Sequence, residues 1–135
     1  MIKKWVYIIG ISIFFLVGCG TGGVMPEKIR DLDFTIVETD DQPQALVDLI
    51  MEKREQPFQM SYSLGEELYI VVGYGTQKSG GYSIQVKECY ETENSIVVDT
   101  ALLGPENKEE ITSTETYPYV VIKTENIPDK MIEFW

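Results

Sequence analysis

The chain has 135 residues, with 11 Lys and Arg, 22 Asp and Glu, two cysteines and no histidine. This length accommodates one domain of ordinary size. The lack of histidine excludes Ser-His-Asp and Cys-His hydrolase sites and histidine-ligated zinc. The formal net charge of −11 argues against nucleic-acid binding, which needs a Lys- and Arg-rich surface to neutralise phosphates.

The first eighteen residues have the pattern of a signal peptide. Lys3 and Lys4 give a positively charged start, and Trp5 to Val17 is an uncharged, mainly apolar run of 13 residues. A helix of that length rises about 20 Å, short of the roughly 30 Å hydrocarbon core of a bilayer. The run therefore predicts a signal peptide over residues 1–18 instead of a membrane-spanning helix.

The apolar run ends in Leu16-Val17-Gly18-Cys19, which resembles the lipobox of bacterial lipoproteins. The resemblance implies that Cys19 is lipid-modified on its sulfur and becomes the first residue after cleavage. The other interpretation, a chance thiol in a membrane anchor, requires a longer apolar run. We therefore expect a protein lipid-anchored to the cell membrane on its extracytoplasmic face, with its oligomeric state left open.

Residues 19–30 are Gly-rich with one Pro and predict a flexible tether, followed by a single β-rich domain over residues 31–135. Only Cys89 remains as a thiol in that domain, so no internal disulfide is expected. Alternation from Tyr82, Ile84 and Val86 puts Cys89 in phase with the polar side of its strand, unless a bulge intervenes. We favour a half-buried, inert strand thiol, because reactivity requires a cationic neighbour.

The domain begins with the composition of a strand at Asp33 to Glu38. Acidic residues and Pro43 then indicate a helix start, and Leu46, Leu49 and Ile50 recur at helical spacing, which predicts an amphipathic helix over about residues 43–55. Pro57 prevents its continuation.

Further strands are predicted after the helix. Leu68 to Tyr74 is apolar on both faces, which is typical of a central strand covered on both sides. The other predicted segments are strands over 58–62, 82–86, 95–103 and 117–122, a polar loop over 104–116, and an apolar tail over 131–135 that docks onto the sheet. This pattern predicts a mainly β fold, an antiparallel β-sandwich or partly open barrel of about six to seven strands with one N-terminal amphipathic helix.

Several of these segments together resemble the C-terminal domain of the PrcB family. The resemblance covers about residues 66–124 and depends on the strand 68–75, Gly80-Gly81-Tyr82-Ser83-Ile84, Gly104-Pro105 and Tyr117-Pro118-Tyr119-Val120-Val121. The family often has Thr before the two glycines, where this chain has Lys78-Ser79. The resemblance implies a non-catalytic partner that assists the assembly or stability of an exported protease.

A second analogy concerns the loop between residues 75 and 82. Chagasin-type inhibitors of cysteine proteases are also small β-sandwiches with a binding loop that ends in a similar Gly-Tyr, although this chain lacks their Pro-Thr-Thr lead. Gly80 and Gly81 either serve a hairpin turn that needs positive φ or let the backbone approach a partner. The candidate partner-binding residues are Gly75, Thr76, Lys78, Ser79, Gly80, Gly81, Tyr82, Tyr117, Pro118 and Tyr119.

The acidic pairs Asp40-Asp41, Glu66-Glu67 and Glu109-Glu110 are interpreted as solvated charge, since none fits an EF-hand spacing. We expect no catalytic residue, metal or cofactor. The leading hypothesis is a lipid-anchored protein-binding module for an exported protease or other envelope protein. The alternatives are a protease inhibitor acting through the 75–82 loop and a small-ligand-binding lipoprotein.

Overall fold

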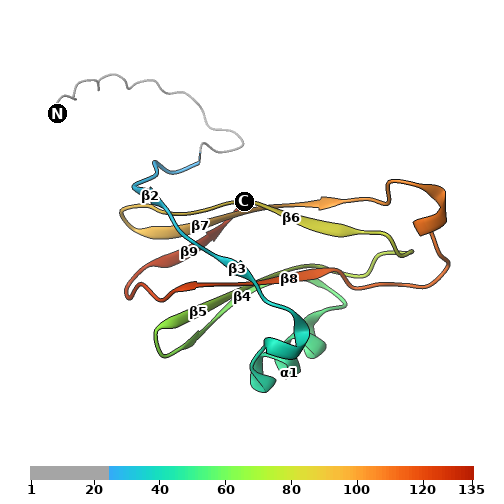
Figure 1. Cartoon of the computed structure of the whole chain (residues 1–135), viewed down its shortest axis with the longest axis horizontal. Coiled ribbons are helices and arrows are strands. Elements are labelled where there is room, and N and C mark those ends of the chain that lie inside the picture. Colours follow the sequence, from blue (N-terminus) through green and yellow to red (C-terminus); the bar gives the residue numbers. More distant parts are fainter. Residues whose placement is uncertain (1–24) are drawn as a thin grey trace.

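The computed structural model describes residues 25–135. The expected signal peptide, the predicted lipid site at Cys19 and the start of the expected tether lie outside the described residues. Two four-stranded sheets pack face to face in the described part of the chain (Figure 1). The architecture is therefore a β-sandwich, as predicted.

Each sheet takes strands from both halves of the domain. The first sheet has the order β2 (Arg30–Asp31), β6 (Ser83–Glu91), β7 (Ser95–Leu103) and β9 (Met131–Phe134). The second sheet has the order β3 (Thr35–Ile36), β8 (Tyr119–Glu125), β5 (Glu67–Tyr74) and β4 (Pro57–Leu64). The described part thus has eight strands, one or two more than expected, because β2 was not predicted and β9 was expected only as a docked tail.

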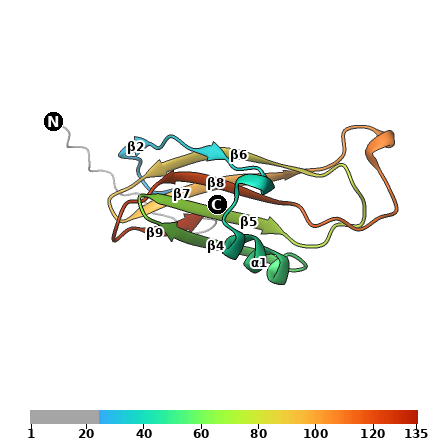
Figure 2. The ribbon, with the colours of Figure 1, turned by 60° about the horizontal axis from the view of Figure 1, so that its bottom comes forward.

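The predicted helix is α1 (Gln44–Lys53), which follows a 3₁₀ turn at Thr39–Asp41. It lies against the outer face of the second sheet (Figure 2). Its fully buried Leu46 and Ile50 pack against Tyr69, Val71 and Val121. Burial of this apolar face fixes the helix on the sheet.

Strand β5 is central and buried on both faces, as its sequence predicts. Leu68, Ile70 and Val72 point into the core between the sheets, and Tyr69 and Val71 point toward α1. Its neighbours β4 and β8 both run antiparallel to it.

Strand β6 contains an irregularity that changes the environment of Cys89. The pairing with β7 shifts between Val86 and Glu88, so one extra residue, Lys87, lies in β6 at this point. A bulge of this kind reverses the side-chain alternation beyond it. Cys89 is therefore 3 % exposed and belongs to the core, more deeply buried than the half-buried position expected from the sequence.

The N-terminal part of the described chain lies along the first sheet. The Ile29 N–H donates to the Glu91 carbonyl at 2.7 Å, and the Tyr90 hydroxyl donates to the Pro26 carbonyl at 3.0 Å. The folded part thus begins near Pro26 and not at Asp31, which shortens the expected tether at its C-terminal end.

Two further expectations need correction. The strand expected over 33–38 is limited to Thr35–Ile36, because the chain leaves the sheet after Val37, whose N–H still donates to the Val121 carbonyl at 2.9 Å, and forms the turn before α1. The apolar tail does dock onto a sheet, but β9 pairs with β7 in parallel, so the first sheet is mixed and not purely antiparallel. Among residues 25–135, no helix is long and apolar enough to cross a membrane.

Candidate functional site

Two loops project together from one end of the sandwich (Figures 1 and 2). The first loop, residues 75–82, connects β5 to β6, and the second, residues 104–118, connects β7 to β8. We call these two segments the paired-loop surface. All ten candidate partner-binding residues lie on it or, for Tyr119, directly after it.

Hydrogen bonds join the two loops along their length. Gln77 and Thr116 exchange two backbone hydrogen bonds of 2.8 and 3.0 Å. The Thr116 hydroxyl donates to the Ser79 carbonyl at 2.7 Å, and the Gly80 N–H donates to the Thr112 hydroxyl at 3.0 Å. The loops are therefore one supported unit and not two independent segments.

The 75–82 loop is a crossover between the sheets, because β5 and β6 belong to different sheets. The hairpin-turn interpretation of Gly80 and Gly81 is therefore wrong. Gly81 does need a positive φ, 89°, and a Cβ there would lie 2.7 Å from Pro105 Cβ and 2.8 Å from Glu110 Cβ. The glycine allows the two loops to approach each other.

Several candidate residues are committed to packing. Gly75 has φ 79° and lies against Pro57, and Ser79 is buried with its hydroxyl donating to the Gly80 carbonyl at 3.1 Å. The Pro118 carbonyl accepts from the Tyr74 N–H at 3.1 Å, and Tyr119 packs beside the α1 cluster. These residues build the surface and leave little side chain for a partner.

The other candidates are more accessible. Thr76 and Lys78 are exposed, and the Thr76 hydroxyl donates to the Glu55 carbonyl at 3.0 Å. Tyr82 and Tyr117 are half-buried, and the Arg54 guanidinium lies 4.3 Å from the centroid of the Tyr117 ring. Within residues 25–135, Lys78 makes no ion pair.

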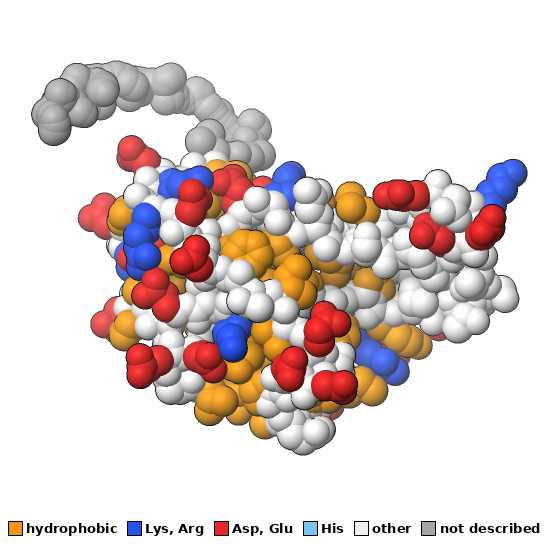
Figure 3. Space-filling model, in the orientation of Figure 1, with side chains coloured by type: hydrophobic (Ala, Val, Ile, Leu, Met, Phe, Trp, Pro, Cys, Tyr) orange, Lys and Arg blue, Asp and Glu red, His pale blue; other side chains and the backbone are white. Residues whose placement is uncertain are grey.

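The second loop carries functional candidates that sequence reasoning missed. Asn107 Oδ1 accepts from the Glu109 N–H at 3.1 Å, and Glu110 Oε1 accepts from the Glu106 N–H at 2.8 Å, so local side-chain contacts shape this loop. Ile111 is 55 % exposed. Figure 3 shows acidic side chains gathered on the projecting end. The Asn-capped turn was readable from the sequence, but the pairing with the first loop was not.

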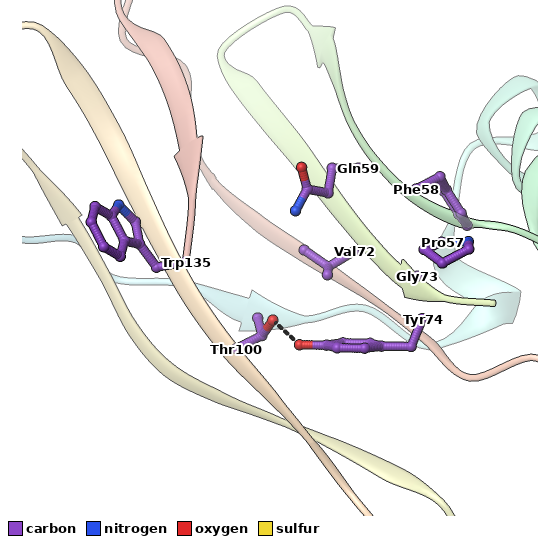
Figure 4. A pocket seen from close by; sticks show the side chains of 8 residues that line it. All are labelled: Pro57, Phe58, Gln59, Val72, Gly73, Tyr74, Thr100 and Trp135. Carbon is purple, nitrogen blue, oxygen red and sulfur yellow. Dashed lines mark hydrogen bonds between the residues drawn. The ribbon is translucent and has the colours of Figure 1, made fainter. Parts of the chain in front are cut away.

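A groove of about 630 Å³ opens beside the sandwich near the base of the first loop (Figure 4). The Tyr74 hydroxyl and Thr100 Oγ1 lie 2.6 Å apart and form a hydrogen bond that joins the two sheets at this point. The remaining lining residues are Pro57, Phe58, Gln59, Val72, Gly73 and Trp135.

The titratable groups with shifted pKa values lie away from the paired-loop surface. Burial raises the pKa of the Cys89 thiol to about 11. The pKa of the Glu91 carboxyl is lowered, mainly by a hydrogen bond from Lys130, with Arg30 contributing in the same direction. Among the described residues, no group of three His, Cys, Asp or Glu side chains is arranged to hold a metal ion.

Residues 68–125 match the family model described as PrcB C-terminal. This segment runs from β5 to the end of β8 and contains both loops of the paired-loop surface. No curated protein and no solved structure matches the chain. The family model thus covers β5 to β8, less than half of the chain, and this segment is similar to PrcB C-terminal domains.

Proposed function

We propose that this protein is a non-catalytic, lipid-anchored extracytoplasmic module that assists the assembly or stability of an exported protease or another envelope complex. The paired-loop surface makes the contact, and the lipid on Cys19 holds the module at the membrane. The observation that carries the proposal is the hydrogen-bonded pairing of two loops inside the segment that matches PrcB C-terminal.

The paired loops suit protein binding because they are held in place before a partner arrives. A surface that is already ordered loses less conformational entropy on binding than free loops lose. It presents the apolar Ile111 beside exposed carboxylates, which are Glu106, Glu109, Glu110 and Glu115. Because of these carboxylates, we expect the partner to present an apolar site with a basic rim.

The test is affinity capture of the tagged full chain from its own membranes after mild crosslinking. The variant is Glu109→Lys with Ile111→Ser, which changes two exposed side chains and leaves the loop hydrogen bonds intact, since only the backbone N–H of Glu109 takes part in them. The matched control is Glu38→Lys with Met131→Ser, since both residues are also exposed but lie outside the paired loops. We expect a stoichiometric exported protein with the parent and the control, and at least a tenfold loss with the loop variant.

Equal recovery of the partner with both variants would exclude the paired-loop surface as the contact. Recovery of only abundant, unrelated lipoproteins would contradict the proposal as a whole. Where an exported protease is recovered, its activity with and without the module separates assistance from the inhibitor alternative.

A further inference from the structure

Strand β4 is the long free edge of the molecule. It has eight residues and pairs only with β5 among the described strands. The other sheet edges, β2, β3 and β9, have two, two and four residues. Figure 2 shows β4 along the border of its sheet. A free strand edge presents N–H and C=O groups that can pair with another chain.

The usual protection of a sheet edge is missing from β4. Its sequence, Pro57-Phe-Gln-Met-Ser-Tyr-Ser-Leu64, has no charged side chain, and its pairing with β5 continues without a bulge. Proline is present only at the first position. Edges that stay unpaired in monomeric proteins are commonly short, charged, bulged or covered, so this edge is suited to pairing.

The backbone of β4 directs alternate residues outward. The Tyr74 N–H donates to the Pro118 carbonyl, so Tyr74 and every second residue before it in β5 direct their backbone N–H and C=O groups to β8. The residues between them direct theirs to β4. Phe58, Met60 and Tyr62 consequently direct their backbone groups to β5. The free edge receives the backbone groups of the alternate residues Pro57, Gln59, Ser61 and Ser63.

The side chains of β4 are complementary to those of a second β4 strand that lies antiparallel to it. Phe58, Met60 and Tyr62 lie on the face that carries α1, and the small polar side chains lie on the other face. A two-fold axis at Met60 places Phe58 opposite Tyr62 of the other copy. The same axis places Gln59 opposite Ser61, so that their outward backbone groups form a hydrogen-bonded pair.

We propose that β4 pairs antiparallel with β4 of a second copy of this chain, around a two-fold axis at Met60. The pairing joins the second sheets of the two copies into one continuous sheet, with Phe58–Tyr62 contacts on either side of a central Met60 pair. Aromatic cross-strand pairs of this kind stabilise sheets. The paired-loop surfaces then point away from each other at the two ends of the dimer, because the axis reverses the strand direction.

Charge favours this edge over the rest of the surface as a contact between copies. Two chains of net charge −11 repel each other, and β4 contributes no charge of its own. Carboxylates flank the strand at both ends: Glu52 and Glu55 line a hollow beside Phe58, and Glu67 pairs with Leu64. Salt screens their repulsion, so the dimer is expected to strengthen as ionic strength rises.

The first test uses a cysteine at the two-fold axis. Residues opposite each other in a non-hydrogen-bonded antiparallel pair have Cα atoms about 4.5 Å apart, within the range of a disulfide. Met60→Cys should therefore form a covalent dimer in membranes after mild oxidation. Leu64→Cys is the matched control, because it is on the same strand and 50 % exposed, but its two copies lie about 26 Å apart in this register.

The parent chain, which contains Cys19 and Cys89, sets the background. At least a fivefold excess of dimer for Met60→Cys over both Leu64→Cys and the parent supports the proposal. Equal amounts overturn it, as does a Met60→Cys chain that forms disulfides only with a different protein, which would identify that protein as the occupant of the edge.

The second test compares two double variants of β4 that differ only in the sign of the charge at position 61. Gln59 and Ser61 are both exposed, so charged substitutions there leave the core intact. Gln59→Lys with Ser61→Lys places Lys opposite Lys across the axis, and Gln59→Lys with Ser61→Glu places Lys opposite Glu. Analytical ultracentrifugation in detergent measures the oligomeric state. At the same concentration, we expect the first variant to be monomeric and the second to be dimeric.

The same sedimentation for both variants would contradict the register. This outcome would leave the protein-binding proposal unaffected, since both substitutions lie in β4 and leave the paired loops unchanged.

Discussion

At Gly81 the backbone has φ 89° and the α-carbon faces the second loop at close range. We predict that Gly81→Ala lowers the free energy of unfolding by about 1–3 kcal/mol, because a side chain strains this backbone and a Cβ meets Pro105 and Glu110. Gly80→Ala is the control, with nearest contacts of 3.4 Å and no positive φ, and should change stability by less than about 0.5 kcal/mol. Urea denaturation measures both, and equal effects would contradict the packing role of Gly81.

Cys89 has a predicted effect on stability at alkaline pH. Burial raises the pKa of its thiol from 9.0 to about 11, so the unfolded chain loses this proton at lower pH than the folded chain. The contribution of the buried thiol is complete below about pH 9 and declines as the pH rises toward 11.

The comparison that isolates this effect is with Cys89→Ala. Melting temperatures of the two chains between pH 8 and pH 11 should converge as the pH rises. A difference that stays constant across this range would show that Cys89 ionises equally in both states.

Among the elements, β6 shows where sequence reasoning reaches its limit. Its alternation from Ile84 to Val86 predicts the strand, but the extra residue at Lys87 reverses the phase and carries Cys89 into the core. Nothing local to Lys87 marks the bulge, because it arises from the pairing with β7. The helix and β5 were predictable, since their periodicity is set by burial within each element.

Strand β2 is attached by a small ionic cluster. The Glu91 carboxylate forms ion pairs with Arg30, at 2.8 Å between Nε and Oε1, and with Lys130, at 3.1 Å between Nζ and Oε2. These contacts lower the pKa of the Glu91 carboxyl. The unfolded chain therefore binds this proton at higher pH. The stabilisation is present above the ordinary Glu pKa and is lost as the pH falls below it.

We predict that Glu91→Gln speeds amide hydrogen exchange at Ile29 and Leu32, whose N–H groups donate to Glu91 and Cys89 carbonyls, and that it weakens the acid dependence of unfolding. Glu93→Gln is the control, because its side chain is exposed. Unchanged exchange in the Glu91 variant would mean that backbone pairing alone holds β2.

For the whole molecule, the hydrogen bond between Tyr74 and Thr100 joins the two sheets near the projecting loops. We predict that Tyr74→Phe lowers the free energy of unfolding by about 1–3 kcal/mol, because the Thr100 hydroxyl loses its partner in a partly buried position. Tyr62→Phe should change stability by less than about 0.5 kcal/mol, since the Tyr62 hydroxyl makes no hydrogen bond within residues 25–135. Thermal unfolding of the two variants provides the measurement.

The candidate site was predictable from the sequence only in part, because contacts between distant segments shape it. The 75–82 loop and the start of β8 stand out in the sequence through Gly80-Gly81-Tyr82 and Tyr117-Pro118-Tyr119. The contacts of Thr112 and Thr116 with the first loop come from the crossing of the chain between sheets, which no local pattern encodes. Because of the same crossing, several of the residues that were predicted to bind a partner pack within the protein instead.

The first two strands of the domain also determine the order in which it can fold. β2 pairs with β6 and β3 pairs with β8, and Arg30 bonds to Glu125, 95 residues further along the chain. The hairpin of β4 and β5 can form as soon as it is synthesised, but β2 has no partner until β6 is present, and β3 has none until β8, near the end of the chain, is present. The last steps of folding therefore form contacts between residues that are far apart in the sequence. Such contacts make the folding rate low compared with that of helical domains of this size. Until these contacts form, the edges of β6 and β8 that β2 and β3 later cover remain open to other chains.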